Sequence, residues 1–196
     1  MRKSINQQWS QIPKPVKVFL FKAVMLLVVW KTIYLVFLLP TRIIDAPATR
    51  SVGIATAKAL NLAYNTQGYT SKKEVQNRQS EFGMLAVDQQ AIYLNNNKIV
   101  AIEDACNGIE LFALYAGFIL CLPAAVSRKL IFIGMGLVAI YLVNIFRCTV
   151  ITWILLAHPQ FFGFAHHYLF TFIVYVFIIW FWLLFTRKLT PQYVQK

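Results

Sequence analysis

Residues 130–156 read LIFIGMGLVAIYLVNIFRCTVITWILL, an almost wholly apolar stretch in which Arg147 is the only charged residue. An α-helix rises about 1.5 Å per residue, so roughly 20 apolar residues cross the hydrocarbon core of a bilayer. This stretch is longer than that minimum. It therefore predicts a membrane-spanning helix, and the rest of the chain is interpreted around it.

Three further apolar stretches have comparable lengths, at residues 18–39, 109–126 and 168–185. The chain is 59% hydrophobic and only 13% charged, whereas soluble domains carry about 25% charged residues. We therefore predict an all-α membrane protein, a polytopic helical bundle of about four transmembrane helices.

The charge distribution predicts the orientation of this bundle. The net charge is +12, yet residues 40–104 hold seven Lys/Arg against six Asp/Glu, so the excess lies elsewhere. The basic clusters are Arg2, Lys3, Lys14 and Lys17; Arg128 and Lys129; and Arg187, Lys188 and Lys196. They fall at alternate ends of successive spans, which predicts a multi-pass protein with both termini cytoplasmic and with the lipid bilayer as a partner. No aromatic-basic groove accompanies the charge, so nucleic acid is not an expected partner.

The same boundaries divide the chain into segments. Residues 1–17 form a cytoplasmic lead, 18–39 the first transmembrane helix, 40–104 an extracytoplasmic loop, 105–186 a core of three transmembrane helices, and 187–196 a cytoplasmic tail. The sequence Ala46-Pro47-Ala48 is similar to a signal-peptidase site. The preceding apolar run is longer than a signal peptide requires, so we expect an uncleaved anchor.

The loop at 40–104 is expected to form a small α/β insertion. Apolar periodicity predicts a helix over 52–64, on the membrane or covering the bundle, and the polar residues 71–81 predict exposed loop. Runs at 84–87, 91–94 and 99–102 are β-prone, and Asn95-Asn96-Asn97 between the last two is a turn signal. The sheet would lead directly into Cys106.

Lys31 lies inside the first apolar stretch, too deep to reach the cytoplasmic interface by snorkelling. It needs a polar partner, a cavity or the far interface. Three cysteines are too few for a disulfide framework, and Cys121 and Cys148 are expected to be small apolar fillers.

Cys106 is the candidate nucleophile. Asp104 is a favourable N-cap residue, which would place Cys106 in the first turn of the following helix, where the dipole favours a thiolate. Glu103 and Asp104 oppose this effect by like charge, so a nearby cation is required.

Arg147 can supply that cation, because it lies near the outer end of its predicted span. Asn144 is one helical turn earlier on the same face and can orient the guanidinium or meet a substrate carbonyl. The structural alternative is an arginine that snorkels to the interface.

His166 and His167 precede the last span and reach the same face of the membrane. A neutral imidazole can take the thiol proton and return it to a leaving amine. Either histidine could instead be a surface or capping residue. A zinc site from His158, His166 and His167 is disfavoured because no carboxylate or second cysteine is suitably spaced.

These residues resemble the signature blocks of the exosortase/archaeosortase family of membrane transpeptidases. The likeness rests on Ala105-Cys106-Asn107-Gly108, on Asn144-x-x-Arg147 and on His166, within residues 84–186. The resemblance implies a catalytic Cys106, Arg147 and His166 at the extracytoplasmic face of a bacterial inner membrane. Two features depart from the pattern: Asn107 stands where Ser or Ala is commoner, and His167 is an alternative to His166.

The resemblance also implies an activity and its partners. The substrates would be exported proteins that end in a short motif, a transmembrane helix and a basic tail. Cys106 would form a thioacyl intermediate, with His166 as general base and acid, while Arg147 and amide groups around Asn107 and Gly108 stabilise the oxyanion. The acyl group would pass to water or to a lipid or glycan acceptor, and no cofactor or metal is expected.

Two other classes compete with this interpretation. A non-catalytic transporter or assembly factor would use Lys31 and Arg147 to line a polar cavity. A different intramembrane protease would need a serine in a Gly-rich context or two histidines flanking a glutamate, and neither arrangement occurs in the sequence.

Overall fold

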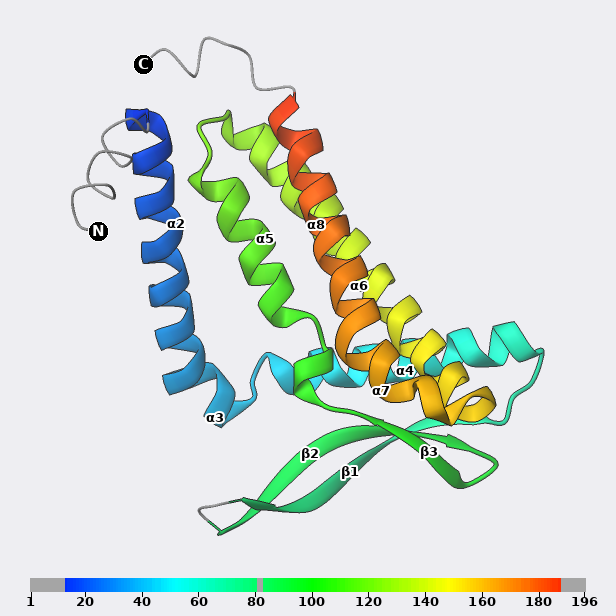
Figure 1. Cartoon of the computed structure of the whole chain (residues 1–196). Helices are drawn as coiled ribbons and strands as arrows, with labels where there is room; N and C mark the ends of the chain where they lie inside the picture. The colour runs from blue at the N-terminus through cyan, green and yellow to red at the C-terminus, as the bar shows by residue number, and fades with distance from the viewer. Residues whose placement is uncertain (1–12, 81–82, 188–196) are drawn as a thin grey trace.

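The computed structural model of the chain describes residues 13–80 and 83–187. Its main feature is a set of apolar helices that lie side by side (Figure 1). They are α2 (Lys14–Ile33), which continues through a π-helical turn η1 (Tyr34–Leu38) into α3 (Leu39–Thr41), then α5 (Ile109–Cys121), α6 (Val126–Ala157) and α8 (Phe170–Arg187). The start of α2, the α5–α6 connection and the end of α8 lie at one end of this bundle (Figure 1).

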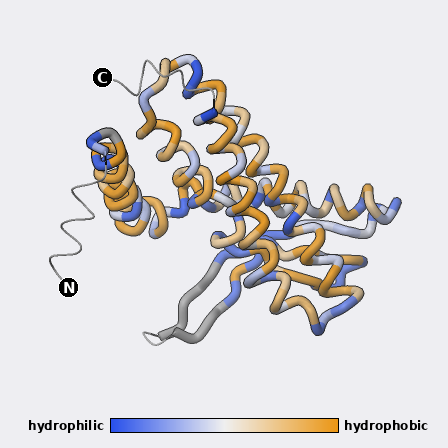
Figure 2. Tube along the Cα trace, turned by 45° about the horizontal axis from the view of Figure 1, so that its top comes forward, coloured by the Kyte–Doolittle hydropathy of each residue, from blue (hydrophilic) through white to orange (hydrophobic). Residues whose placement is uncertain are grey.

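The helices of the bundle are apolar over most of their length, as the hydropathy colouring in Figure 2 shows. Large side chains such as Phe21, Val138 and Phe172 are each more than 60% exposed. In length and composition two segments qualify as membrane spans, Val16–Thr41 and Val126–Ala157, and the apolar helices Ile109–Cys121 and Phe172–Arg187 are shorter. The helical fold is therefore confirmed and is consistent with a helical membrane protein, whereas the count of four spans stays a prediction.

At the opposite end of the bundle, α4 (Asp45–Tyr64) lies across the helix ends with a small antiparallel sheet beneath it (Figure 1). The strands β1 (Tyr69–Ser80), β2 (Gly83–Leu94) and β3 (Asn97–Ile102) pair in the order β1-β2-β3. We call this the sheet end. The predicted α/β insertion is thus present, and its helix begins at Asp45, seven residues before the expected start at residue 52.

The prediction of exposed loop over 71–81 is wrong for the described part, because residues 69–80 form a strand paired along β2. It was missed because β1 is an edge strand with charged, exposed side chains such as Lys72 and Lys73, a composition typical of protected sheet edges. The runs 84–87 and 91–94 belong to one strand. The turn prediction is confirmed: Asn95 and Asn96 both have positive φ, 48° and 69°, as a two-residue hairpin turn requires.

Helix α6 is shared by two apolar cores. Toward the sheet end, Cys148 packs with Val52 and Leu60 of α4 and with Ile92 and Ile102 of the sheet. The second core joins α5, α6 and α8, and its buried members are Tyr115, Ile119, Ile140, Val174, Ile178 and Phe185. Because α6 is unbroken from Val126 to Ala157, residues 149–156 continue the third predicted span.

The partner that Lys31 requires is Glu110 of α5, whose Oε1 lies 2.7 Å from the lysine Nζ. This pair ties α2 to α5 near the sheet end. Closer to the middle of the helices, Leu26 of α2 packs where Gly117 of α5 leaves room for it.

Candidate active site

Cys106 lies at the sheet end, between β3 and α5, in a 3-10 turn (Asp104–Cys106). The sequence-based prediction that Asp104 caps α5 and that Cys106 lies in its first turn is wrong. Helix α5 begins at Ile109, after Gly108 at φ +86°, a left-handed conformation that glycine adopts readily. Cys106 therefore lies outside the first turn of α5, three residues before the helix begins.

Asp104 instead anchors the turn to the segment that follows α3. Its two carboxylate oxygens accept hydrogen bonds from Nε and Nη2 of Arg42, both at 2.8 Å, and Oδ1 also accepts one from the Thr49 hydroxyl at 2.7 Å. Arg42 also pairs with Asp88 of β2 at 2.6 Å. These charge-assisted bonds fix Asp104, which lies two residues before Cys106.

Asn107 anchors the other side of Cys106. Its side chain is 2% exposed and donates to Oδ1 of Asp45 at 2.7 Å, while its own oxygen accepts from the Ile109 amide at 2.8 Å. Asp45 is fully buried and also accepts a bond from the Tyr34 hydroxyl at 3.2 Å. Sequence reasoning missed Arg42, Asp45 and Thr49, because these contacts join residues 55 to 62 positions apart.

His166 reaches Cys106 from the segment before α8. Its Nε2 lies 3.9 Å from the Cys106 Sγ, and its ring stacks on Phe162 with centroids 5.7 Å apart. It belongs to a π-helical turn, η4 (Ala165–Leu169). The His167 side chain lies outside the described residues, and His158 packs instead against the rings of Trp153 and Phe161.

Arg147 completes the group from α6. It lines a small cavity together with Cys106, His166 and Cys148, and it also lines a neighbouring cavity of about 280 Å³. Within residues 13–80 and 83–187 it forms no ion pair, and its buried Nε has no hydrogen-bond partner. A buried donor that lacks a protein acceptor is unusual, and an arginine in this state is free to bind an anion.

Asn144 binds the backbone of the cysteine turn. Its Nδ2 donates to the Cys106 carbonyl at 2.7 Å, and the side chain is 1% exposed. It therefore binds the cysteine turn directly, a contact that the sequence did not predict. The two predicted roles, orienting the guanidinium or meeting a substrate carbonyl, stay predictions.

The larger of these two cavities lies between the cysteine turn, the π-helical turn η1 and the helices α5, α6 and α8. Tyr34, Gly108, Glu110, Arg147 and Tyr175 are among the residues that line it. Of the two amide groups expected to bind an oxyanion, that of Asn107 is already used, since it donates to the Asp104 carbonyl at 3.1 Å. Gly108 and Arg147 both line this space, so the Gly108 amide and the Arg147 guanidinium are the candidate oxyanion donors.

The groups around Cys106 have opposing effects on the pKa of its thiol. Burial raises the pKa of its thiol, the positive charge of Arg147 lowers it, and the negative charge of Glu103 raises it again, with a net increase above the ordinary value. A raised pKa means that the resting group is a neutral thiol at pH 7. Its reactivity would depend on a base within reach, and His166 occupies that position.

Taken together, a thiol, an imidazole and a guanidinium that has no ion-pair partner among the described residues meet at one end of an apolar helical bundle. This arrangement defines a membrane protein with a candidate thiol-based site at its surface. The sequence model of the transmembrane exosortase family matches residues 16–186, so the chain belongs to that family. Searches of curated proteins and of solved structures gave no match.

Proposed function

We propose that this exosortase-family protein is a cysteine transpeptidase or peptidase that cleaves C-terminal sorting signals from exported proteins. The observation that carries the proposal is the 3.9 Å approach of Cys106 Sγ to His166 Nε2 beside Arg147, with which they line one small cavity. These three residues come from separate segments of the chain. They supply a nucleophile, a base and a fixed positive charge, which are the parts that acyl transfer needs.

The reaction would begin with proton transfer, because the thiol is neutral at rest. His166 Nε2 takes the proton from Sγ as the sulfur attacks the scissile carbonyl carbon, and Arg147 with the Gly108 amide stabilises the negative oxygen that forms. The C–N bond then breaks, and the imidazolium returns the proton to the departing amine. A thioester on Cys106 remains, and water or an amine of a lipid or glycan acceptor resolves it.

The charge distribution supports an orientation. The sheet end would lie on the extracytoplasmic side of a bacterial inner membrane, since Lys14, Lys17, Arg128, Lys129 and Arg187 all lie toward the opposite end. A substrate with its own transmembrane helix would then meet the site within the same bilayer. Shared anchorage supplies proximity that is worth several kcal/mol in favourable cases.

The test is site-resolved labelling followed by loss of function. A thiol-directed probe should modify Cys106, and Cys106→Ala should abolish maturation of an exported protein that carries an anchor and a basic tail. Cys121→Ala is the matched control, because Cys121 lies at the end of α5 remote from the sheet, and it should leave maturation unchanged.

Separate replacement of His166 and His167 by Ala would assign the base. A fully folded Cys106→Ala protein that still matures its substrate would exclude this mechanism. It would favour a non-catalytic transporter or assembly factor.

A further inference from the structure

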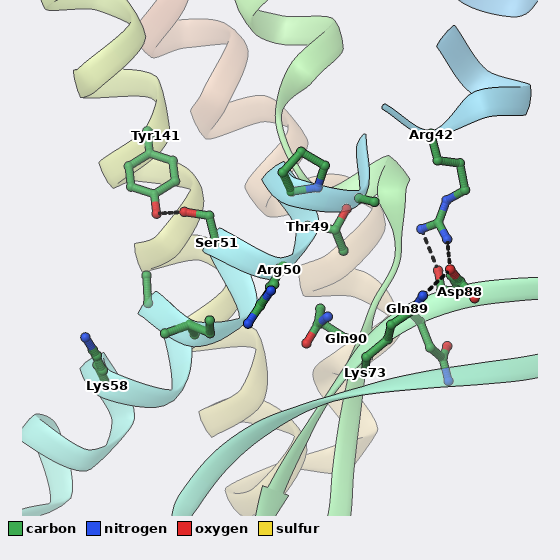
Figure 3. Close-up of a pocket in the computed structure, with 14 residues that line it drawn as sticks. Arg42, Thr49, Arg50, Ser51, Lys58, Lys73, Asp88, Gln89, Gln90 and Tyr141 are labelled. Carbon is green, nitrogen blue, oxygen red and sulfur yellow. Dashed lines mark hydrogen bonds and ion pairs between the residues drawn. The ribbon is translucent and has the colours of Figure 1, made fainter. Parts of the chain in front are cut away.

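A second recess lies on the flank of α4, away from the cysteine site. It has a volume of about 700 Å³ and lies among α4, the sheet and the middle of α6 (Figure 3). This volume is within the range of small-molecule binding sites, roughly 300–1,000 Å³. We call it the α4 groove.

The α4 groove is strongly basic. Among the residues that the structure describes, four cations line it, Arg42, Arg50, Lys58 and Lys73, against the single carboxylate of Asp88. Asp88 already pairs with Arg42 at 2.6 Å and with Lys73 at 2.8 Å, and these cations hold its pKa below the ordinary value.

Arg50 and Lys58 provide the excess positive charge. Neither forms an ion pair or hydrogen bond with any part of the chain that the structure describes. Figure 3 shows Arg50 projecting from α4 into the middle of the groove, with Lys58 further along the same helix. The two residues are eight positions apart, about two helical turns, so their long side chains can close on one ligand from both sides.

Hydroxyl groups and apolar surface complete the lining. The Ser51 and Tyr141 hydroxyls lie 2.6 Å apart, and this contact ties α4 to α6. Ile54 also lines the groove. The groove therefore offers hydrogen-bond donors beside an apolar wall.

The groove also borders the apolar exterior of α6. Tyr141 is one turn from Val138 and directly precedes Leu142, and these two side chains are 61% and 58% exposed. They belong to a stripe of exposed apolar residues that runs along α6 and also includes Ile131, Met135 and Phe146. A basic recess at the edge of a lipid-facing helix is the arrangement that binds an acidic lipid headgroup while its chains lie along the helix.

We propose that the α4 groove binds the phosphodiester headgroup of an anionic phospholipid. Arg50 presents the planar fork that matches phosphate oxygens, and Lys58 adds a point charge from the next part of the helix. The acyl chains lie against Val138 and Leu142. The site is independent of Cys106 and anchors α4, and with it Thr49 and the network around the cysteine turn, to the bilayer surface.

The experiment uses the full chain in neutral detergent and dihexanoyl phosphatidylglycerol below its micelle-forming concentration. Thermal unfolding is followed by tryptophan fluorescence during a lipid titration. We expect the lipid to raise the melting temperature, and dihexanoyl phosphatidylcholine and inorganic phosphate to have little effect. The variant Arg50→Gln/Lys58→Gln should need about thirtyfold more phosphatidylglycerol, from the typical contribution of two basic residues near a lipid surface.

The matched control is Lys14→Gln/Lys72→Gln, which removes two exposed positive charges outside the groove. It should bind phosphatidylglycerol like the wild type. Cys106→Ala should also bind the lipid like the wild type, even though this substitution is expected to abolish the proposed catalysis, so lipid binding and catalysis can fail independently. Equal weakening in the control pair, equal stabilisation by phosphatidylcholine, or equal stabilisation by inorganic phosphate would each overturn the proposal. The last result would identify the ligand as a free anion.

Discussion

Arg42 is predicted to hold the cysteine turn in place, and Arg42→Ala tests this most directly. The substitution removes two hydrogen bonds to Asp104, an ion pair with Asp88 and a bond to the Asp88 carbonyl at 3.0 Å. Hydrogen bonds to charged groups contribute about 1.5–3 kcal/mol each but are not additive. Asp104 keeps its hydrogen bond from the Thr49 hydroxyl, and Asp88 keeps its ion pair with Lys73. The side chains of Arg42, Asp88 and Asp104 are 17–28% exposed. We therefore expect a net loss of about 3 kcal/mol, below the plain sum.

The measurement is the free energy of unfolding in mixed micelles together with the melting temperature. A loss of about 3 kcal/mol corresponds to a decrease of roughly 6–12 °C for a chain of this size. Arg50→Ala in lipid-free detergent is the control, because Arg50 is exposed and without a partner among the described residues, and it should change stability by less than about 0.5 kcal/mol. Equal effects of the two substitutions would refute the anchoring role.

Two further predictions concern packing and pH. In α6, Gly136→Ala should destabilise the protein by about 1–3 kcal/mol, because the new methyl group would overlap the buried ring of Tyr115. Gly134→Ala places its methyl group in open space and should stabilise the protein by up to about 1 kcal/mol. Unfolding in mixed micelles measures both changes, and the same sign for both would contradict the described helix packing. The rate of Cys106 alkylation should rise with pH up to a midpoint above the ordinary thiol value, because burial raises its pKa. Arg147→Gln removes the charge that lowers this pKa, so the midpoint should move to still higher pH, and a shift to lower pH in rates followed by mass spectrometry would disprove the coupling.

The sequence determined the membrane character of the protein, because the apolar stretches appear in composition and length alone. It also determined the hairpin turn, since Asn95 and Asn96 tolerate positive φ better than most residues. The blocks around Cys106, Arg147 and His166 identified the family, and the structure brings these three residues to one small cavity. Local chemistry and residue order were sufficient for these conclusions.

The tertiary structure alone decided the surroundings of the cysteine. The sequence favoured an N-cap at Asp104, yet that carboxylate binds Arg42 and Thr49, and the helix begins after Gly108. The sequence did not predict strand β1, because β1 has no apolar alternation of its own. Its pairing with β2 holds it in place. For Asp104, partners 55 to 62 positions away override the local preference, and the packing of α4 on α6 and the sheet sets their positions. For β1 the partner is the next strand of the chain, and it is the pairing itself that overrides the local preference for a loop.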